Sequence, residues 1–140
     1  ALSHPGGKLG RKLLLMVKDI MHKGPRMPIV SAETSISHAL IEMSSKGLGM
    51  TAIIDNQGQL AGVYTDGDLR RTLDQGLDIH QTAIKDAMSI NCKVASPCML
   101  AAEALNLMET SKINGLIVTD ENNKPIGALN MHDLLRAGVM

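Results

Sequence analysis

The stretch GVYTDGDLRR, residues 62–71, returns near the end of the chain as GALNMHDLLR, residues 127–136. Each copy has a glycine, two apolar or aromatic residues, a polar residue, two variable positions and an aspartate. A second pair of copies lies upstream, because VKDIM at residues 17–21 returns as IKDAM at residues 84–88. The chain is therefore built from one small unit used twice, and this repeat determines the prediction of the fold.

We call residues 17–21 and 84–88 the lead-ins of the two copies. After its lead-in, each copy predicts the element order β-α-β-β-α. The middle of each copy predicts an amphipathic helix, since apolar residues recur at i, i+3, i+4 and i+7 from Ile36 and again from Ala101. Thr34 or Ser35 is suited to cap the first of these helices. The predicted strands are residues 29–30, 51–54 and 60–64 in the first copy and residues 93–95, 116–119 and 126–129 in the second, with a last helix from Asp66 and from Met131.

Units of about 60 residues bury little apolar surface on their own. We therefore expect an α+β fold in which two tandem β-α-β-β-α units pack sheet to sheet as a pseudo-twofold pair.

The polar residue and the aspartate of each motif predict a crevice at a helix N-terminus. Thr65 or Asn130 ends a strand, and Asp68 or Asp133 lies in the first turn of the next helix. A carboxylate there can accept hydrogen bonds from both hydroxyls of a ribose, and the helix offers backbone N–H groups to an anion. The same spacing fits a capping box, in which the two side chains satisfy each other's backbone. Spacing leaves both interpretations open, and they are compatible.

Composition and motifs argue against several classes of function. The chain carries 14 Lys and Arg against 14 Asp and Glu, which is not the basic footprint of a nucleic-acid-binding protein. The sequence contains no glycine-rich phosphate loop, no histidine pair at metal-ligand spacing and no nucleophilic triad, so we expect neither a metal site nor catalysis. Two cysteines, Cys92 and Cys98, and the lack of a long apolar run indicate a reduced, cytoplasmic protein with no membrane partner.

The duplicated motifs make the chain resemble the CBS domain, a β-α-β-β-α unit that works in tandem pairs. The Gly-x-x-Thr-x-x-Asp pattern of residues 62–68 is similar to that family's ribose-binding signature. A closer resemblance is to the C-terminal part of bacterial arabinose 5-phosphate isomerases, in LSHPGGKLGRKLLL, VKDIMHKG, TDGDLRR and MHDLLRAGV. Those enzymes join an N-terminal sugar-isomerase (SIS) domain to a CBS pair. They interconvert ribulose 5-phosphate and arabinose 5-phosphate in the synthesis of Kdo for lipopolysaccharide or capsule.

The resemblance implies a division of the chain. Residues 1–16 correspond to a linker and the end of an SIS domain, residues 17–76 to the first CBS domain and residues 77–140 to the second. His4 corresponds to a histidine of the SIS active site, so we expect no isomerase activity from this chain by itself. We expect the CBS pair to form a homodimer, with the SIS domain of the parent enzyme as its neighbour.

The resemblance also implies a nucleotide or nucleotide-sugar effector and no cofactor. AMP is one candidate, and CMP-Kdo is another because an activated end product suits feedback on the first step. Asn130 stands where the signature prefers Thr or Ser, so we expect the first crevice to bind better than the second. The candidate ligand-binding residues are Thr65, Asp66, Asp68, Arg70, Arg71, Asn130, His132, Asp133 and Arg136.

Two features leave the ligand and the role of the pair open. Gly49-Met50 and Asn114-Gly115 lack the basic residues with which AMP-sensing relatives hold phosphate, so Arg70, Arg71, His132 or Arg136 would meet the charge of a ligand. The alternative function is a structural module that helps the parent oligomerise and has no physiological ligand.

Overall fold

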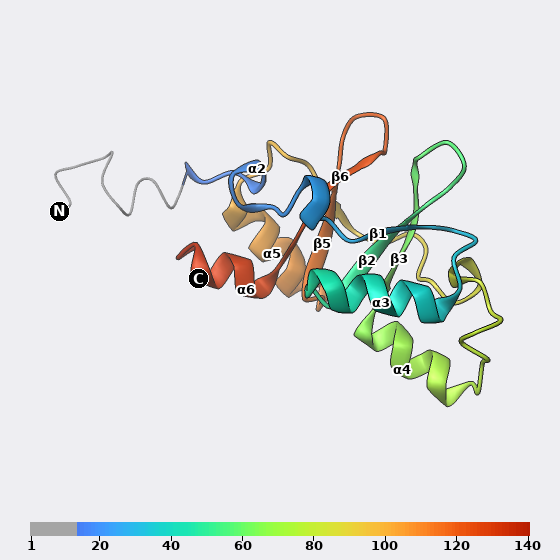
Figure 1. Ribbon diagram of the computed structural model, residues 1–140. Helices are drawn as coiled ribbons and strands as arrows, with labels where there is room; N and C mark the ends of the chain where they lie inside the picture. Colours follow the sequence, from blue (N-terminus) through green and yellow to red (C-terminus); the bar gives the residue numbers. More distant parts are fainter. Residues whose placement is uncertain (1–13) are drawn as a thin grey trace, which may run out of the picture.

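The computed structural model describes residues 14–140, so His4 and the proposed end of an SIS domain lie outside the described residues. The first unit contains, in order, α2 (Val17–Ile20), η1 (Gly24–Arg26), β1 (Ile29–Ser31), α3 (Ile36–Lys46), β2 (Met50–Ile54), β3 (Leu60–Thr65) and α4 (Asp66–Asp74). The second contains η2 (Ile84–Asp86), β4 (Val94–Ala95), α5 (Ala101–Ser111), β5 (Gly115–Thr119), β6 (Pro125–Asn130) and α6 (Met131–Arg136). Figure 1 shows the two halves side by side. The predicted α+β class and the order β-α-β-β-α in each unit are confirmed.

Over residues 14–140 the strands form two three-stranded sheets of identical topology, β1-β2-β3 and β4-β5-β6. β1 runs parallel to β2, and β2 pairs antiparallel with β3, with a bulge between Ile53 and Ile54. The second sheet repeats this register, including the bulge, between Val118 and Thr119. The parallel pair in each sheet requires a crossover, which α3 and α5 provide.

The helices form where the apolar period predicts them. Ile36, Ala39 and Met43 are buried along one face of α3, and the corresponding face of α5 is buried in the same way. Ser35 is the N-cap of α3 and accepts a hydrogen bond from the backbone N–H of His38 at 3.3 Å. Of the two predicted caps, Thr34 and Ser35, Ser35 is therefore the one that caps the helix.

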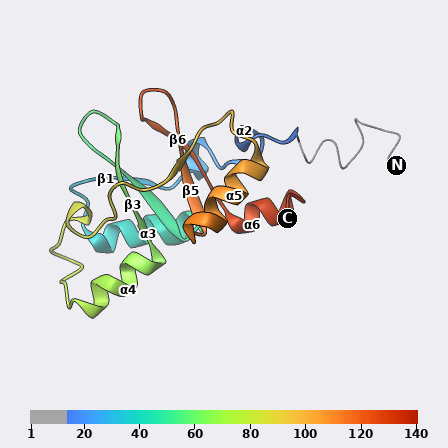
Figure 2. The same ribbon diagram turned by 180° about the vertical axis from the view of Figure 1, so that it is seen from behind.

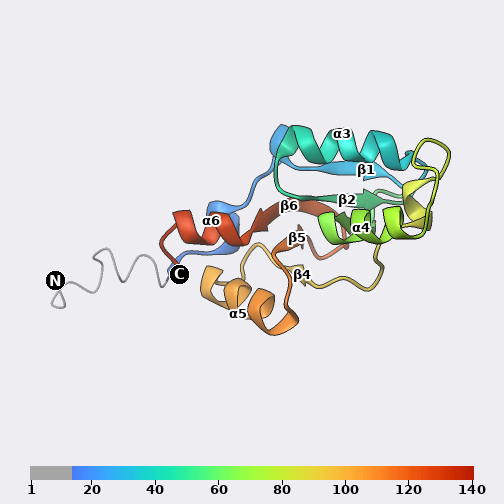
Figure 3. The same ribbon diagram turned by 90° about the horizontal axis from the view of Figure 1, so that it is seen from below.

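The two sheets pack face to face. Figure 3 shows α3 and α5 on opposite outer sides, with the sheets between them. An apolar cluster between the sheets joins Met50 and Ala52 of β2 to Ile117 of β5 and Ala128 of β6. Gly115 lies directly against Met50 here, because a Cβ at this position would lie 2.7 Å from Sδ of Met50 and that side chain would have to move. The predicted packing of sheet against sheet is confirmed.

Each lead-in packs on the other unit. Val17 of α2 is fully buried in the core of the second sheet, and Figures 1 and 2 show α2 beside α5 and β6. Ile84 of η2 is fully buried in the core of the first sheet. Beyond these helices, His22 forms a backbone bridge with Ala128 of β6, and Ser89 forms the matching bridge with Val63 of β3. The lead-ins therefore tie the two units together, and each supplies a wall to the crevice of the unit on which it packs.

Candidate functional site

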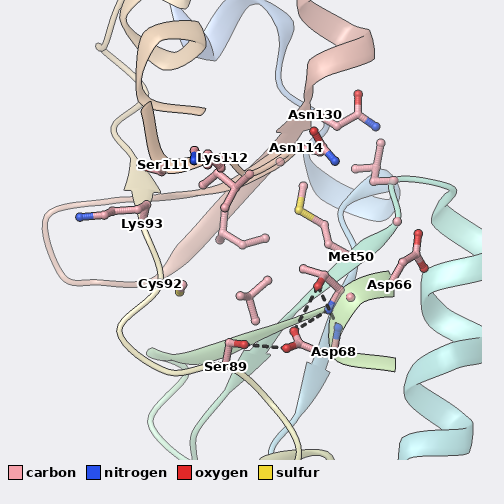
Figure 4. A pocket seen from close by; sticks show the side chains of 18 of the residues that line it. Met50, Asp66, Asp68, Ser89, Cys92, Lys93, Ser111, Lys112, Asn114 and Asn130 are labelled. Atoms are coloured by element: carbon pink, nitrogen blue, oxygen red, sulfur yellow. Dashed lines mark hydrogen bonds between the residues drawn. The ribbon is translucent and has the colours of Figure 1, made fainter. Parts of the chain in front are cut away.

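A pocket of about 1030 Å³ opens between the two units, on the side where β3 and β6 run into α4 and α6. Its volume is at the upper end of the range for small-molecule sites, roughly 300–1,000 Å³. Figure 4 shows Asp68 and Ser89 of the first crevice on one side of it and Asn114 and Asn130 of the second unit on the other. A molecule bound here would contact both units.

The pocket has a symmetric centre and an asymmetric extension. Its centre is lined by repeat-related pairs: Gly49 with Asn114, Met50 with Gly115, Thr65 with Asn130, Asp66 with Met131, and Gly67 with His132. The rest of its lining is asymmetric: Asp68 and Arg71 of the first crevice, Ser89, Asn91, Cys92 and Lys93 of the segment between the units, and Thr110, Ser111 and Lys112 at the C-terminal end of α5. Among residues 14–140, Asp133, Arg136 and His22, the counterparts of Asp68, Arg71 and Ser89, lie outside this pocket. The open volume thus continues into the first crevice.

In the first crevice, Asp68 caps α4 and also binds the lead-in. Its Oδ2 accepts from the backbone N–H of Thr65 at 2.9 Å and from the Thr65 hydroxyl at 3.2 Å. Its Oδ1 accepts from the Ser89 hydroxyl at 2.7 Å and from the Arg71 guanidinium. The Thr65 hydroxyl in turn accepts from the backbone N–H of Asp68, which completes the capping box. The capping interpretation of the motif is therefore confirmed, and the carboxylate is only 3 % exposed.

In the second crevice, Asp133 has the same cap with different partners. Its Oδ2 accepts from the backbone N–H of Asn130 at 2.8 Å, and Asn130 caps the N–H of Asp133. Its Oδ1 lies 2.9 Å from Nε2 of His22 and accepts from Arg136 at 2.8 Å. Burial by itself would raise the pKa of Asp133, but the hydrogen bonds from His22, the Asn130 backbone and Arg136 lower it below 3.8.

The helix of the first crevice is fixed from behind by Tyr64. The Tyr64 hydroxyl lies 2.7 Å from Oγ1 of Thr72, and the Thr72 hydroxyl donates to the backbone carbonyl of Asp68 at 2.9 Å. Burial raises the pKa of Tyr64, so the phenol stays protonated at neutral pH. These bonds hold the turn that carries Asp68 against β3.

The structure brings six of the nine predicted ligand residues to the pocket: Thr65, Asp66, Asp68, Arg71, Asn130 and His132. Within the described residues, the other three, Arg70, Asp133 and Arg136, do not line it. Arg70 is exposed on α4, whereas Asp133 and Arg136 belong to the second crevice. The role of all nine in ligand binding stays a prediction.

Sequence reasoning missed the pocket residues that come from outside the motifs. The most important are Ser89 and two lysines: Lys93, which precedes β4, and Lys112, the C-cap residue that follows α5. The repeat offered one signal for Ser89, because it directly follows the second lead-in, IKDAM. The sequence predicts Arg70, Arg71, His132 or Arg136 as the partners of a ligand's charge, and the pocket lining adds these two lysines. Figure 4 shows the side chain of Lys93 directed away from Asp68.

The lining of the pocket contains hydrogen-bonding and charged side chains and one free thiol, Cys92. Over residues 14–140 no group of three or more His, Cys, Asp or Glu side chains is placed to hold a metal ion. Burial raises the pKa of the Cys92 thiol, which keeps this pocket residue protonated and weakly nucleophilic. The arrangement is suited to hold a molecule by hydrogen bonds and charge.

Comparison with known families decides what this duplicated unit is. The profile of the CBS domain matches residues 17–75 and again residues 84–139. The chain belongs to the CBS domain family. Each match begins at a lead-in, so the family unit in sequence includes the segment that packs on the other unit in space.

Several similar curated proteins are arabinose 5-phosphate isomerases. The CBS pair is 56% identical over its 140 residues to arabinose 5-phosphate isomerase KdsD of Pseudomonas aeruginosa and 51% identical to that of Escherichia coli. It matches the C-terminal part of these enzymes and spans 43% and 42% of their lengths.

The part of the chain from residue 14 onward contains no helix with the length and apolar character needed to cross a bilayer.

Solved CBS structures share the fold. A crystal structure of CBSX2 in complex with AMP has a TM-score of 0.77 and 26% identity, and the match covers 89% of this chain and 96% of that one. The CBS domain pair of protein MJ0100, in complex with 5′-methylthioadenosine and S-adenosyl-L-methionine, has a TM-score of 0.78 and 24% identity, covering 88% and 94%.

Proposed function

We propose that this CBS pair is the ligand-sensing regulatory part of an arabinose 5-phosphate isomerase, with catalysis in an SIS domain outside the described residues. The identity to KdsD enzymes across the whole chain supports the parent activity, the conversion of ribulose 5-phosphate to arabinose 5-phosphate for Kdo and lipopolysaccharide or capsule synthesis. The observation that carries the sensing role is the pocket of about 1030 Å³ that both units line. A cytoplasmic location follows from the same proposal.

The ligand that we propose is a nucleotide or nucleotide-sugar, with CMP-Kdo and AMP as the two candidates. The AMP complex of CBSX2, which has the same fold, supports a nucleotide in such a module. Thr65 and Asp68 would contact the ribose hydroxyls, and the anionic part of the ligand would lie toward Arg71, Lys112 and His132, which line the same pocket. Opposite charges on the two partners strengthen such hydrogen bonds.

The existing hydrogen bond between Asp68 and Ser89 suggests how ligand binding in the pocket would alter the segment between the two units. Its Oδ1 already accepts from Ser89, which belongs to the segment between the two units. A ribose hydroxyl that takes this place would release the Ser89 side chain, and the segment from Ile90 to Lys93 could then shift while the Ser89 backbone stays paired with Val63. A ligand with higher affinity for the shifted state would then favour it. This exchange links occupancy of the pocket to the relative placement of the units.

A purely structural role is the second candidate. Exposed leucines support it: Leu73 on α4 is 61% exposed and Leu135 on α6 is 55% exposed. Helix faces of this kind suit a homodimer of CBS pairs, which we propose as the assembly in either case. The neutral net charge does not favour a nucleic-acid partner.

A thermal-shift panel separates the two functions. The purified chain would be heated with AMP, ATP, CMP, CMP-Kdo and arabinose 5-phosphate. A ligand at 100 times its dissociation constant stabilises a protein by about 2.7 kcal/mol, which raises the melting temperature by several degrees. A shift with a nucleotide or nucleotide-sugar is the expected result. No shift with any of these compounds would leave the structural role as the function.

A further inference from the structure

The two lead-ins follow the same backbone path into the two crevices. Ser89 exchanges backbone hydrogen bonds with Val63 at 2.8 and 2.9 Å, and His22 exchanges them with Ala128 at 2.8 and 3.0 Å. Gly62 and Gly127 make room for the two crossings, because a Cβ on either would meet the lead-in at 2.5–2.7 Å. The side chains of Ser89 and His22 therefore start from equivalent places.

The two side chains reach the same carboxylate oxygen in their crevices but differ in size. The Ser89 hydroxyl binds Oδ1 of Asp68, and Nε2 of His22 binds Oδ1 of Asp133. The imidazole adds a five-membered ring where serine has one oxygen, and this ring is only 21% exposed. The first crevice is continuous with the central pocket, whereas Asp133 lies outside it.

We propose that His22 closes the second crevice, so that the module has a single ligand site per chain, and that the residue after each lead-in determines which crevice is open. Serine at this position leaves the first crevice continuous with the pocket, although the Asp68 carboxylate itself is buried. The inference rests on the proposed function for the identity of the ligand, but the closure by His22 does not depend on it.

A ring-replacement experiment tests the closure without any nucleotide. His22→Ala removes the imidazole, and since surrounding atoms relax only in part, a cavity of that shape remains and can take up a small ring. We expect 20 mM 4-methylimidazole to raise the melting temperature of His22→Ala by several degrees and to leave wild type unchanged. Ser89→Ala, which removes a single oxygen, is the matched control and is expected to gain nothing. Equal responses of His22→Ala and wild type would overturn the closure.

A calorimetric titration with CMP-Kdo, and in parallel with AMP, tests the single site. Wild type is expected to bind one molecule per chain, and Ser89→His is expected to bind at least tenfold more weakly because the ring fills the first crevice. Two molecules per wild-type chain, or unchanged affinity in Ser89→His, would overturn the inference. If wild type binds neither compound, the proposed ligands are wrong, and the ring-replacement result still decides whether His22 closes the second crevice.

Discussion

The two crevices have the same backbone and the same capping aspartate, yet they differ in what surrounds the carboxylate. Asp68 meets a hydroxyl from the lead-in and borders the large pocket, whereas Asp133 meets an imidazole and lies outside that pocket. The capping box is thus a property of the repeat, whereas the partner that the carboxylate takes from the lead-in is a residue far away in sequence. The family motif predicts the capping box, but it does not predict which residue of the lead-in meets the carboxylate.

The largest difference in stability that we expect between the units concerns their matched glycines. In Gly62→Ala the new Cβ would lie 2.6 Å from the backbone carbonyl oxygen of Ser89, so the chain itself must move, at a cost of about 3 kcal/mol. In Gly127→Ala the nearest atom is Sδ of Met21, and the backbone oxygen of His22 is 3.2 Å away. A methionine can turn aside, so we expect about 1 kcal/mol. Urea unfolding of both variants measures this, and equal losses would contradict the account.

A smaller effect concerns the support behind the first crevice. The hydroxyls of Tyr64 and Thr72 are hydrogen-bonded to each other, whereas Leu129 and Ala137, which have no hydroxyl, occupy the corresponding positions of the second unit. Tyr64→Phe keeps the ring and loses the hydrogen bond, so we expect a loss of about 1 kcal/mol in the free energy of unfolding. Thr72→Val is the matched variant, and its combination with Tyr64→Phe should cost less than the sum of the two. Additive losses would show that the bond contributes nothing.

The smallest expected effect is a dependence of stability on pH in the second crevice. The pKa of Asp133 is lowered in the folded protein, so its ionised form contributes stability above pH 3.8, and this contribution is lost as the pH falls through the lower folded value. Urea midpoints of wild type and Asp133→Asn should therefore converge on acidification below pH 4. His22→Ala should weaken the dependence, because His22 is one cause of the shift. A gap that widens in acid would contradict the assigned ion pair.

The sequence predicted nearly the whole order of elements, because the apolar period and the repeat are local signals. Ser35 as a cap and the capping boxes at Thr65 and Asn130 are also local, and the structure contains all three. The pairing of Arg71 with Asp68 could have been predicted from their spacing of three residues on one helix.

The long-range contacts could not be predicted in this way. Ser89 lies 21 residues from Asp68, and His22 lies 111 residues from Asp133. These pairs meet only because each lead-in packs on the other unit, which no local pattern encodes. Lys112, which follows α5 of the second unit, likewise lines a pocket with residues of the first unit that are distant in sequence.

The most direct test of the central claim, that the first crevice is the ligand site, is the affinity of CMP-Kdo and AMP for Asp68→Ala and Asp133→Ala by calorimetry. Both variants remove a capping carboxylate, so each is the stability control for the other, with a cap loss of about 1 kcal/mol expected in both. We expect Asp68→Ala to bind the better ligand about 10- to 100-fold more weakly, since a hydrogen bond to a charged group contributes roughly 1.5–3 kcal/mol. Asp133→Ala should bind it like wild type. Normal binding by Asp68→Ala, or loss of binding in Asp133→Ala alone, would contradict the account.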